Sequence, residues 1–364
     1  MKKGKIKYSF PGGNTPRGFY SFYNLGLQNM ERVFILKGGP GTGKSTLMRN
    51  IGLEMAERGY NVEFWQCSSD NDSLDGVVIP DLKLAVVDGT APHVVDPQYP
   101  GAVDQIVNLG DHWNEEYLRG HKNEIKKLTG EISNSFSTAY QYLKNAKTVY
   151  DEWKKINVAA MDFEKANQKT EKLMQEIFRT NAPLVRHMFA GAISPGGMVN
   201  FIKNITEDCK TRYILKGLPG TGKSSLIKKI VEGAVDRGYQ ADVYHCTLDP
   251  DSIDMAVIPQ LGVAVLDGSV PHVEDPERPG DRVINMLDCL DLDAVGQKSA
   301  RLEEIQAEFN RLMTEAISKI TQAKNLHDAL EVFYIKAMDF EAVDETRNQV
   351  LNKILAAAEK GDIL

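Results

Sequence analysis

Two short segments of the sequence combine glycines with a lysine and a serine at a spacing that suits phosphate binding. Residues 38–45 read GGPGTGKS and residues 217–224 read GLPGTGKS, so both fit the pattern G-x-x-x-x-G-K-S. Glycines let successive backbone N–H groups point inward around phosphate oxygens, and a helix that starts directly afterwards adds the positive end of its dipole. The lysine then reaches the outer phosphates of a nucleoside triphosphate. The predicted nucleotide-binding residues are Gly38, Gly39, Pro40, Gly41, Thr42, Gly43, Lys44, Ser45 and Thr46, and Gly217, Leu218, Pro219, Gly220, Thr221, Gly222, Lys223, Ser224 and Ser225.

An aspartate at the end of an apolar segment is the expected partner of each glycine loop. The run LAVVD ends at Asp88, and the run VAVLD ends at Asp267. A serine hydroxyl and a carboxylate are oxygen ligands that Mg²⁺ uses beside phosphates. We therefore expect Ser45 with Asp88, and Ser224 with Asp267, to hold Mg²⁺. The alternative is an aspartate that only caps the turn before the next glycine.

A histidine follows each of these aspartates within a repeated Pro-His-Val-x-Asp-Pro segment. His93 and His272 are followed three residues later by Asp96 and Asp275. A histidine at that edge of a sheet can donate a hydrogen bond to phosphate or orient the attacking water. A rigid turn whose histidine bonds backbone carbonyls is the alternative. The candidate catalytic residues are Lys44, Asp88 and His93, with Lys223, Asp267 and His272 in the second copy.

Three further aspartates recur after the second apolar segment of each copy. They are Asp70, Asp72 and Asp75, which match Asp249, Asp251 and Asp254. Strand ends are where the sites of α/β proteins lie, so these acids are candidates to hold a second substrate or a water. Asp-x-Asp-Ser runs also form turns and cap helices, and that interpretation stays open.

The motifs recur because the chain contains an internal duplication. From Ile35 to Gly101 the sequence matches the segment 179 residues later without a gap. Upstream, residues 10–13 match residues 194–197 after a five-residue gap, and downstream residues 160–164 match residues 337–341 at an offset of 177. A duplicated and fused gene with a boundary near residue 185 accounts for these matches. We predict repeats at residues 1–184 and 185–364, with cores at 1–110 and 185–295 and helical arms at 111–184 and 296–364.

Each core is predicted to be α/β, with parallel strand–helix–strand units. In the first repeat, apolar strands at residues 33–37, 61–67 and 82–87 surround a helix that starts at Lys44 and ends near Arg58. No further apolar strand is evident. We therefore expect two tandem abbreviated sheets, each with a β-rich leader that can replace a missing strand.

Beyond residue 110 the sequence becomes charged, helix-favouring and nearly free of proline and glycine. Residues 112–180 and 300–359 predict a long helical hairpin in each repeat. Such an arm covers the sheet or the other repeat, or else binds a partner protein. Because two homologous cores with short sheets have matching apolar surface, we also predict that they pack as a pseudo-twofold pair.

Composition limits the classes of function. The chain has 364 residues, with 43 basic and 50 acidic side chains, and a formal charge of −7, which disfavours binding to nucleic acid. No stretch is long and apolar enough to predict a membrane span, and the basic N-terminus lacks the apolar region of a signal peptide. The four cysteines have neither metal spacing nor the density of a disulfide framework. We expect a cytoplasmic protein.

These motifs resemble those of the P-loop NTPase superfamily over about the first hundred residues of each repeat. The doubled core is also similar to a bacterial family of tandem-P-loop ATP-binding proteins. The resemblance implies ATP and Mg²⁺ as ligands, and it implies functional roles for Lys44, Ser45, Asp88 and their equivalents Lys223, Ser224 and Asp267. Many ATPases of the superfamily carry a glutamate directly after the aspartate, whereas Gly89 and Gly268 stand there in this chain.

Three functions are compatible with this sequence. The first is a Mg²⁺-dependent ATPase with two nucleotide sites that acts as a conformational switch. The second is a small-molecule or nucleotide kinase, whose acceptor the aspartates and His93 would hold. The third is a nucleotide-binding regulator without turnover. A second copy that retains Lys223 argues against a degenerate site, and no repeated arginine cluster supports a kinase lid.

Overall fold

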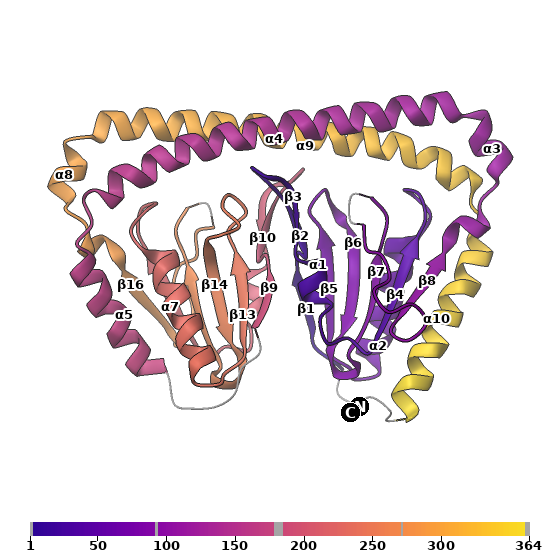
Figure 1. Ribbon diagram of the computed structural model, residues 1–364, viewed down its shortest axis with the longest axis horizontal. Coiled ribbons are helices and arrows are strands. Elements are labelled where there is room, and N and C mark those ends of the chain that lie inside the picture. Colours follow the sequence, from indigo (N-terminus) through magenta and orange to yellow (C-terminus); the bar gives the residue numbers. More distant parts are fainter. Residues whose placement is uncertain (1–2, 92–93, 178–184, 271, 361–364) are drawn as a thin grey trace.

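Each repeat builds its own sheet, and the two sheets stand side by side (Figure 1). The computed structural model describes residues 3–91, 94–177, 185–270 and 272–360. The first core contains β1 (Ile6–Ser9), β2 (Gly12–Thr15), β3 (Gly18–Ser21), α1 (Tyr23–Gly26), β4 (Arg32–Lys37), α2 (Lys44–Glu57), β5 (Val62–Cys67), β6 (Asp70–Ile79), β7 (Leu84–Asp88) and β8 (Asp104–Asn108). The second contains β9 (Val185–Met188), β10 (Gly191–Ser194), β11 (Gly197–Asn200), α6 (Ile202–Ile205), β12 (Thr211–Lys216), α7 (Lys223–Asp236), β13 (Ala241–His245), β14 (Ile253–Ile258), β15 (Val263–Asp267) and β16 (Asp281–Asn285).

The described strands form two six-stranded, mostly parallel sheets with matching strand orders, β1-β5-β6-β7-β4-β8 and β9-β13-β14-β15-β12-β16. The expected abbreviation of the sheets is therefore wrong. The sequence interpretation missed β6 and β8, and β6 runs antiparallel to both of its neighbours. Only two residues separate β5 from β6, and a parallel connection needs a crossover of about a dozen residues or more. The leader does supply an edge strand, because β1 pairs with β5 and β9 pairs with β13.

The leaders keep the same 179-residue offset as the cores, so the five-residue gap is a wrong alignment. The hairpin β2–β3 corresponds to β10–β11, and Gly18 and Gly197 occupy equivalent turns with φ of 91° and 96°. Phe10 and Phe189 form an antiparallel bridge in which each N–H donates to the other's carbonyl, at 3.1 and 3.0 Å. Because these two phenylalanines are equivalent, the bridge joins the halves reciprocally, as a pseudo-twofold pair requires.

The helical arms exchange between the halves. They comprise α3 (Glu115–Gly120), α4 (Lys122–Val158) and α5 (Phe163–Ile177), and α8 (Leu292–Gly296), α9 (Ser299–Ala337) and α10 (Phe340–Lys360). Figure 1 shows α4 and α9 side by side across the top of both sheets, with α5 beside the second core and α10 beside the first. Instead of the expected hairpin within each repeat, the long helix of one repeat packs against the long helix of the other. The shorter helix then packs on the opposite core.

The exchange is held by apolar contacts at both ends. Leu173 and Ile177 of α5 belong to the core around α7, while Val350 and Ile354 of α10 belong to the core around α2. The backbone also pairs reciprocally where the arms return, because Asn114 donates to Ala337 O and Asp291 donates to Ala160 O, both at 2.8 Å. The pseudo-twofold arrangement of the cores therefore extends to the arms.

A buried ion pair crosses the boundary between the two sheets. Arg186 on β9 donates to Glu63 Oε2 on β5 at 2.7 Å, and Glu63 Oε1 accepts from Ser9 and Trp65. Burial by itself raises the pKa of Glu63, but Arg186 and these two donors outweigh it and lower the pKa. Glu63 is therefore ionised and buried between the halves, and it depends on Arg186 for compensation.

We predict that Arg186→Ala lowers the free energy of unfolding by about 2–4 kcal/mol, because it leaves the Glu63 carboxylate buried without its cation. The matched control is Arg301→Ala, which breaks a pair with Glu152 whose side chains are 55% and 46% exposed. The control is expected to cost at most about 1 kcal/mol. Urea unfolding of the three proteins measures the difference. Equal losses in the two variants would contradict the compensating role of Arg186.

Candidate functional site

The two glycine loops have the backbone geometry of an anion cradle. The first loop (residues 38–45) joins β4 to α2, and the second loop (residues 217–224) joins β12 to α7. Gly41 and Gly43 have φ of 69° and 88°, and Gly220 and Gly222 have φ of 87° and 82°. Positive φ at alternate residues turns consecutive N–H groups to one side, and only glycine adopts it without strain. Gly43 and Gly222 directly precede the first residues of α2 and α7, so each cradle also lies at a helix N-terminus.

The predicted lysines lie inside their own loops. Lys44 Nζ donates to the carbonyls of Gly38 and Gly39 at 3.0 and 2.6 Å, and it lies 3.6 Å from Asp88 Oδ2. In the second loop Lys223 Nζ donates to Gly217 and Leu218 at 2.7 and 2.9 Å. Both lysine side chains are more than nine-tenths buried. Each ammonium is therefore held inside its loop by two backbone carbonyls and lies beside an aspartate carboxylate.

The predicted magnesium ligands converge on the same edge of each sheet. Asp267 Oδ2 lies 3.5 Å from Lys223 Nζ, and its other oxygen accepts from the backbone N–H of Ser269 at 2.9 Å. Ser224 Oγ accepts from the N–H of Ile253 at 2.9 Å, which ties the loop to β14. The first half repeats the arrangement, with Ser45 bound to Leu74 and Asp88 bound to Thr90. A hydroxyl and a carboxylate beside a phosphate cradle are donors that suit Mg²⁺.

Asp254 and the equivalent Asp75 lie beside the predicted magnesium aspartates of their own halves. The β14–β15 register pairs Met255 with Leu266, and the β6–β7 register pairs Gly76 with Val87. Asp254 and Asp75 are the next residues along, and Asp254 lies close enough to Asp267 for their charges to interact. Burial, followed by the charge of Asp267, raises the pKa of Asp254 to about 7. The recurrence of these aspartates is visible in the sequence, but their positions beside Asp88 and Asp267 depend on the antiparallel strands β6 and β14, and β6 has no clear apolar pattern at its start.

The glycine that follows each of the predicted magnesium aspartates is required by packing. A Cβ at Gly89 would lie 2.4 Å from Ile35 Cγ2 and 2.9 Å from the carbonyl oxygen of Val95, and Gly268 is enclosed in the same way. No glutamate side chain fits there without moving the strand. A water-orienting acid, if present, must therefore come from another element.

The two predicted catalytic histidines do not join this cluster in the described part of the chain. His93 lies outside the described residues. His272 faces Gly191 of β10, where a Cβ would meet its ring at 3.0 Å, and burial lowers its pKa to about 4. Asp96 and Asp275, the aspartates three residues after the histidines, pair with Lys37 and Lys216 at 3.1 and 2.8 Å.

The remaining repeated aspartates meet lysines of the exchanged arms. Asp70 lies 3.4 Å from Lys324 of α9, and the equivalent Asp249 lies 3.7 Å from Lys147 of α4. These two lysines are themselves equivalent at the 177-residue offset. Sequence analysis did not single them out, although their recurrence in both arms was a usable signal. Asp72 and Asp251 lie at the exposed rim, where Asp251 pairs with Arg17.

Each loop is covered by the arm of the other repeat. The second cover (residues 147–161) bonds the second loop through Asn157 Nδ2, which donates to Pro219 O at 2.6 Å. Its backbone also touches the loop, since a Cβ at Gly220 would lie 2.6 Å from the carbonyl oxygen of Lys154. The first cover (residues 324–343) places Tyr334 against Gly39, where a Cβ would lie 2.3 Å from the ring. Both candidate sites are therefore built from both repeats.

Comparison of the chain with protein-family models, curated proteins and solved structures gave no match. Among the described residues, no helix combines the length and the apolar character needed to cross a lipid bilayer. The functional assignment therefore depends on the chemistry of the two sites.

The raised pKa of Asp254 gives the stability of the chain a defined pH dependence. The folded pKa of about 7 lies above the ordinary value of 3.8, so the folded state keeps a proton that the unfolded state has released. This contribution is complete below pH 3.8 and is lost as pH rises through 7. We predict that Asp254→Asn is more stable than the parent protein at pH 8, by about 1–3 kcal/mol, and that the gain shrinks toward pH 4.5.

Urea unfolding with a chelator present at both pH values measures this difference. Asp251→Asn is the control, because its exposed carboxylate already pairs with Arg17, and no gain is expected at pH 8. A gain of equal size at pH 4.5 and pH 8 in Asp254→Asn would show that burial does not raise the pKa of this group.

Proposed function

We propose that the chain is a Mg²⁺-dependent ATPase of the P-loop NTPase type, with two composite nucleotide sites whose state is transmitted through the exchanged arms. The observation that carries the proposal is the repeated cluster of a glycine cradle, a buried lysine, and a serine–aspartate pair on a strand–loop–helix unit. Each half retains every part of this cluster.

ATP binding would use the groups that are already aimed into the loop. The β- and γ-phosphates replace the carbonyls of Gly217 and Leu218 as partners of the Lys223 ammonium, while the loop N–H groups bond the remaining oxygens. Ser224 and Asp267 are the groups that would hold Mg²⁺, and Ser45 and Asp88 are their equivalents. When bound, Mg²⁺ neutralises phosphate charge and polarises the γ-phosphoryl group.

Hydrolysis needs a base that the position after Asp88 and Asp267 cannot provide. Asp254 lies close enough to Asp267 for their charges to interact, and its pKa of about 7 suits proton transfer at neutral pH. In the proposed step, the oxygen of water bonds to the γ-phosphorus, the bond to the ADP oxygen breaks, and the water proton moves to Asp254. Asp75 is the equivalent base in the first site.

The covers connect nucleotide state to the arms. Lys223 bonds the carbonyl of Leu218, and Asn157 bonds the carbonyl of the next residue, Pro219. If Lys223 binds a phosphate instead of Leu218 O, the loop segment at Leu218 and Pro219, which Asn157 of α4 contacts, changes its hydrogen bonds. Because α4 packs along α9, whose far end covers the first loop, the two sites are coupled reciprocally. This coupling supports the switch over an isolated binding module.

We predict two ATP molecules per chain, and one in each of Lys44→Ala and Lys223→Ala, because each substitution removes the ammonium of one site. Isothermal titration with ATP and Mg²⁺ measures the stoichiometry. Lys216→Ala is the matched control, since this lysine bonds Gly268 O and Asp275 instead of its loop, and two sites are expected to remain. Two ATP molecules bound to Lys223→Ala would exclude the second site.

We predict that the double variant Asp75→Asn with Asp254→Asn keeps ATP affinity while turnover falls by about 10²–10⁴, as expected for a lost general base. Asp251→Asn should hydrolyse ATP like the parent protein. Assays of ADP and free phosphate measure turnover. Unchanged turnover in the double variant would refute the base. ADP without free phosphate, in the presence of cell metabolites, would indicate a kinase, and binding without ADP formation would indicate a regulator.

A further inference from the structure

The two covers differ at two of three positions on the helical turn that contacts each loop, and they share an aspartate at the third. At the 177-residue offset, Tyr150, Asp151 and Lys154 of α4 correspond to His327, Asp328 and Glu331 of α9. The backbones of the two turns occupy equivalent places, because Lys154 O lies close to Gly220 and Glu331 O lies close to Gly41. The turn of α4 therefore presents a lysine and one carboxylate, and the turn of α9 presents a histidine and two carboxylates.

Lys154 carries a positive charge beside the second half's repeated aspartates. Its Nζ lies 3.5 Å from Asp249 Oδ2, and its backbone contacts the loop itself. At the first loop Glu331 stands in the same place, so this half has no lysine there. The first cover therefore lacks this cation and has acidic side chains at the turn, where a bound metal ion would restore positive charge.

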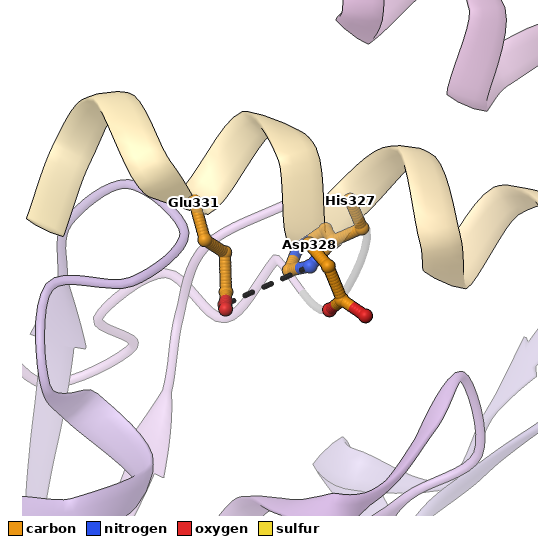
Figure 2. A group of neighbouring side chains, drawn as sticks. All are labelled: His327, Asp328 and Glu331. Atoms are coloured by element: carbon orange, nitrogen blue, oxygen red, sulfur yellow. Dashed lines mark ion pairs between the residues drawn. The ribbon is translucent and has the colours of Figure 1, made fainter.

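His327, Asp328 and Glu331 have the composition and spacing of a metal-binding group. Their potential ligand atoms all lie within 4.8 Å of one another. Figure 2 shows the three side chains projecting from the same side of α9 toward the ribbons of the first half. His327 and Glu331 are separated by four residues, the helical spacing that places two ligands on one face. His327 Nδ1 is shielded from solvent, makes no hydrogen bond and lies 3.7 Å from Glu331 Oε1.

We propose that His327, Asp328 and Glu331 bind a divalent transition-metal ion beside the first loop. An imidazole nitrogen with two carboxylates favours Zn²⁺ over Mg²⁺, which prefers oxygen ligands alone. Three protein ligands leave a coordination position open to water or to a phosphate oxygen. The metal site itself does not depend on the proposed ATPase, whereas its role as the counterpart of Lys154 does.

The Lys324 ammonium would compete with a metal ion for the Asp328 carboxylate. This ammonium pairs with Asp328 and also lies 3.4 Å from Asp70. A bound metal ion would take Asp328 and leave Lys324 paired with Asp70. Removal of the ammonium by Lys324→Ala should therefore tighten metal binding.

The test is calorimetric titration of Zn²⁺ into the full chain, stripped with a chelator, without nucleotide and with excess Mg²⁺ to occupy oxygen-only sites. Glu331→Lys is the main variant, because it introduces the residue that the second half carries at the same turn. We expect one fewer Zn²⁺ per chain, or affinity weakened at least about tenfold, in Glu331→Lys and in His327→Ala. Tyr150→Ala should bind like the parent protein. Zinc held by cysteines would be common to all these proteins and cancels in the comparison.

Equal Zn²⁺ binding in the parent, Glu331→Lys and His327→Ala would overturn the site, and unchanged or weaker binding in Lys324→Ala would overturn Asp328 as a ligand. Circular dichroism confirms that each variant is folded. Titration of the same proteins with ATP separates the two proposals. Zinc binding without any ATP binding would support the metal site and refute the ATPase, and the reverse result would do the opposite.

Discussion

The antiparallel packing of α4 against α9 determines which groups lie over each glycine loop. The two helices bury Ala139 and Leu143 against Ala316 and Ile320, all fully inaccessible to solvent. Small alanines allow a close approach, and each buried leucine or isoleucine contributes about 1.5–3 kcal/mol. A shift of one helix along the other would move Asn157 or Tyr334 off its loop. The composition of both sites therefore depends on a contact that lies far from either of them.

Several residues that differ between the halves lie where the two halves contact each other. At the centre, Arg186 stands where the first half has Lys7, and Glu63 stands where the second half has Asp242. At the covers, His327 and Glu331 replace Tyr150 and Lys154. The loop lysines, serines and aspartates are the same in both halves. This distribution suits a protein in which the two sites share one chemistry while their surroundings become specialised.

Local patterns predicted much of each core, because a strand such as Val33–Lys37 and the glycines after it act within a few residues. The strand β6 escaped prediction because it starts with Asp70, Asn71 and Asp72, which are typical of turns. The leader was aligned wrongly because the identical Pro-Gly-Gly sequences were matched to each other. The equivalent turns are at Gly18 and Gly197, which keep the 179-residue offset. The sequence left open whether each arm covers its own sheet or the other repeat. An apolar stripe such as Ala139 and Leu143 requires a partner surface but does not specify which half supplies it.

The exchanged arms also set the order in which the protein can mature during synthesis. The apolar core around α2 includes Val343, Val350 and Ile354, which are contributed by the last helix of the described chain. The first core ends at Asn108 and α10 begins at Phe340, so about 230 residues are synthesised before the helix that covers this core. The second core, by contrast, is made after α5. For most of translation the first core holds exposed apolar surface. The topology therefore leaves the first core prone to aggregation during that interval, which is the condition that chaperones relieve.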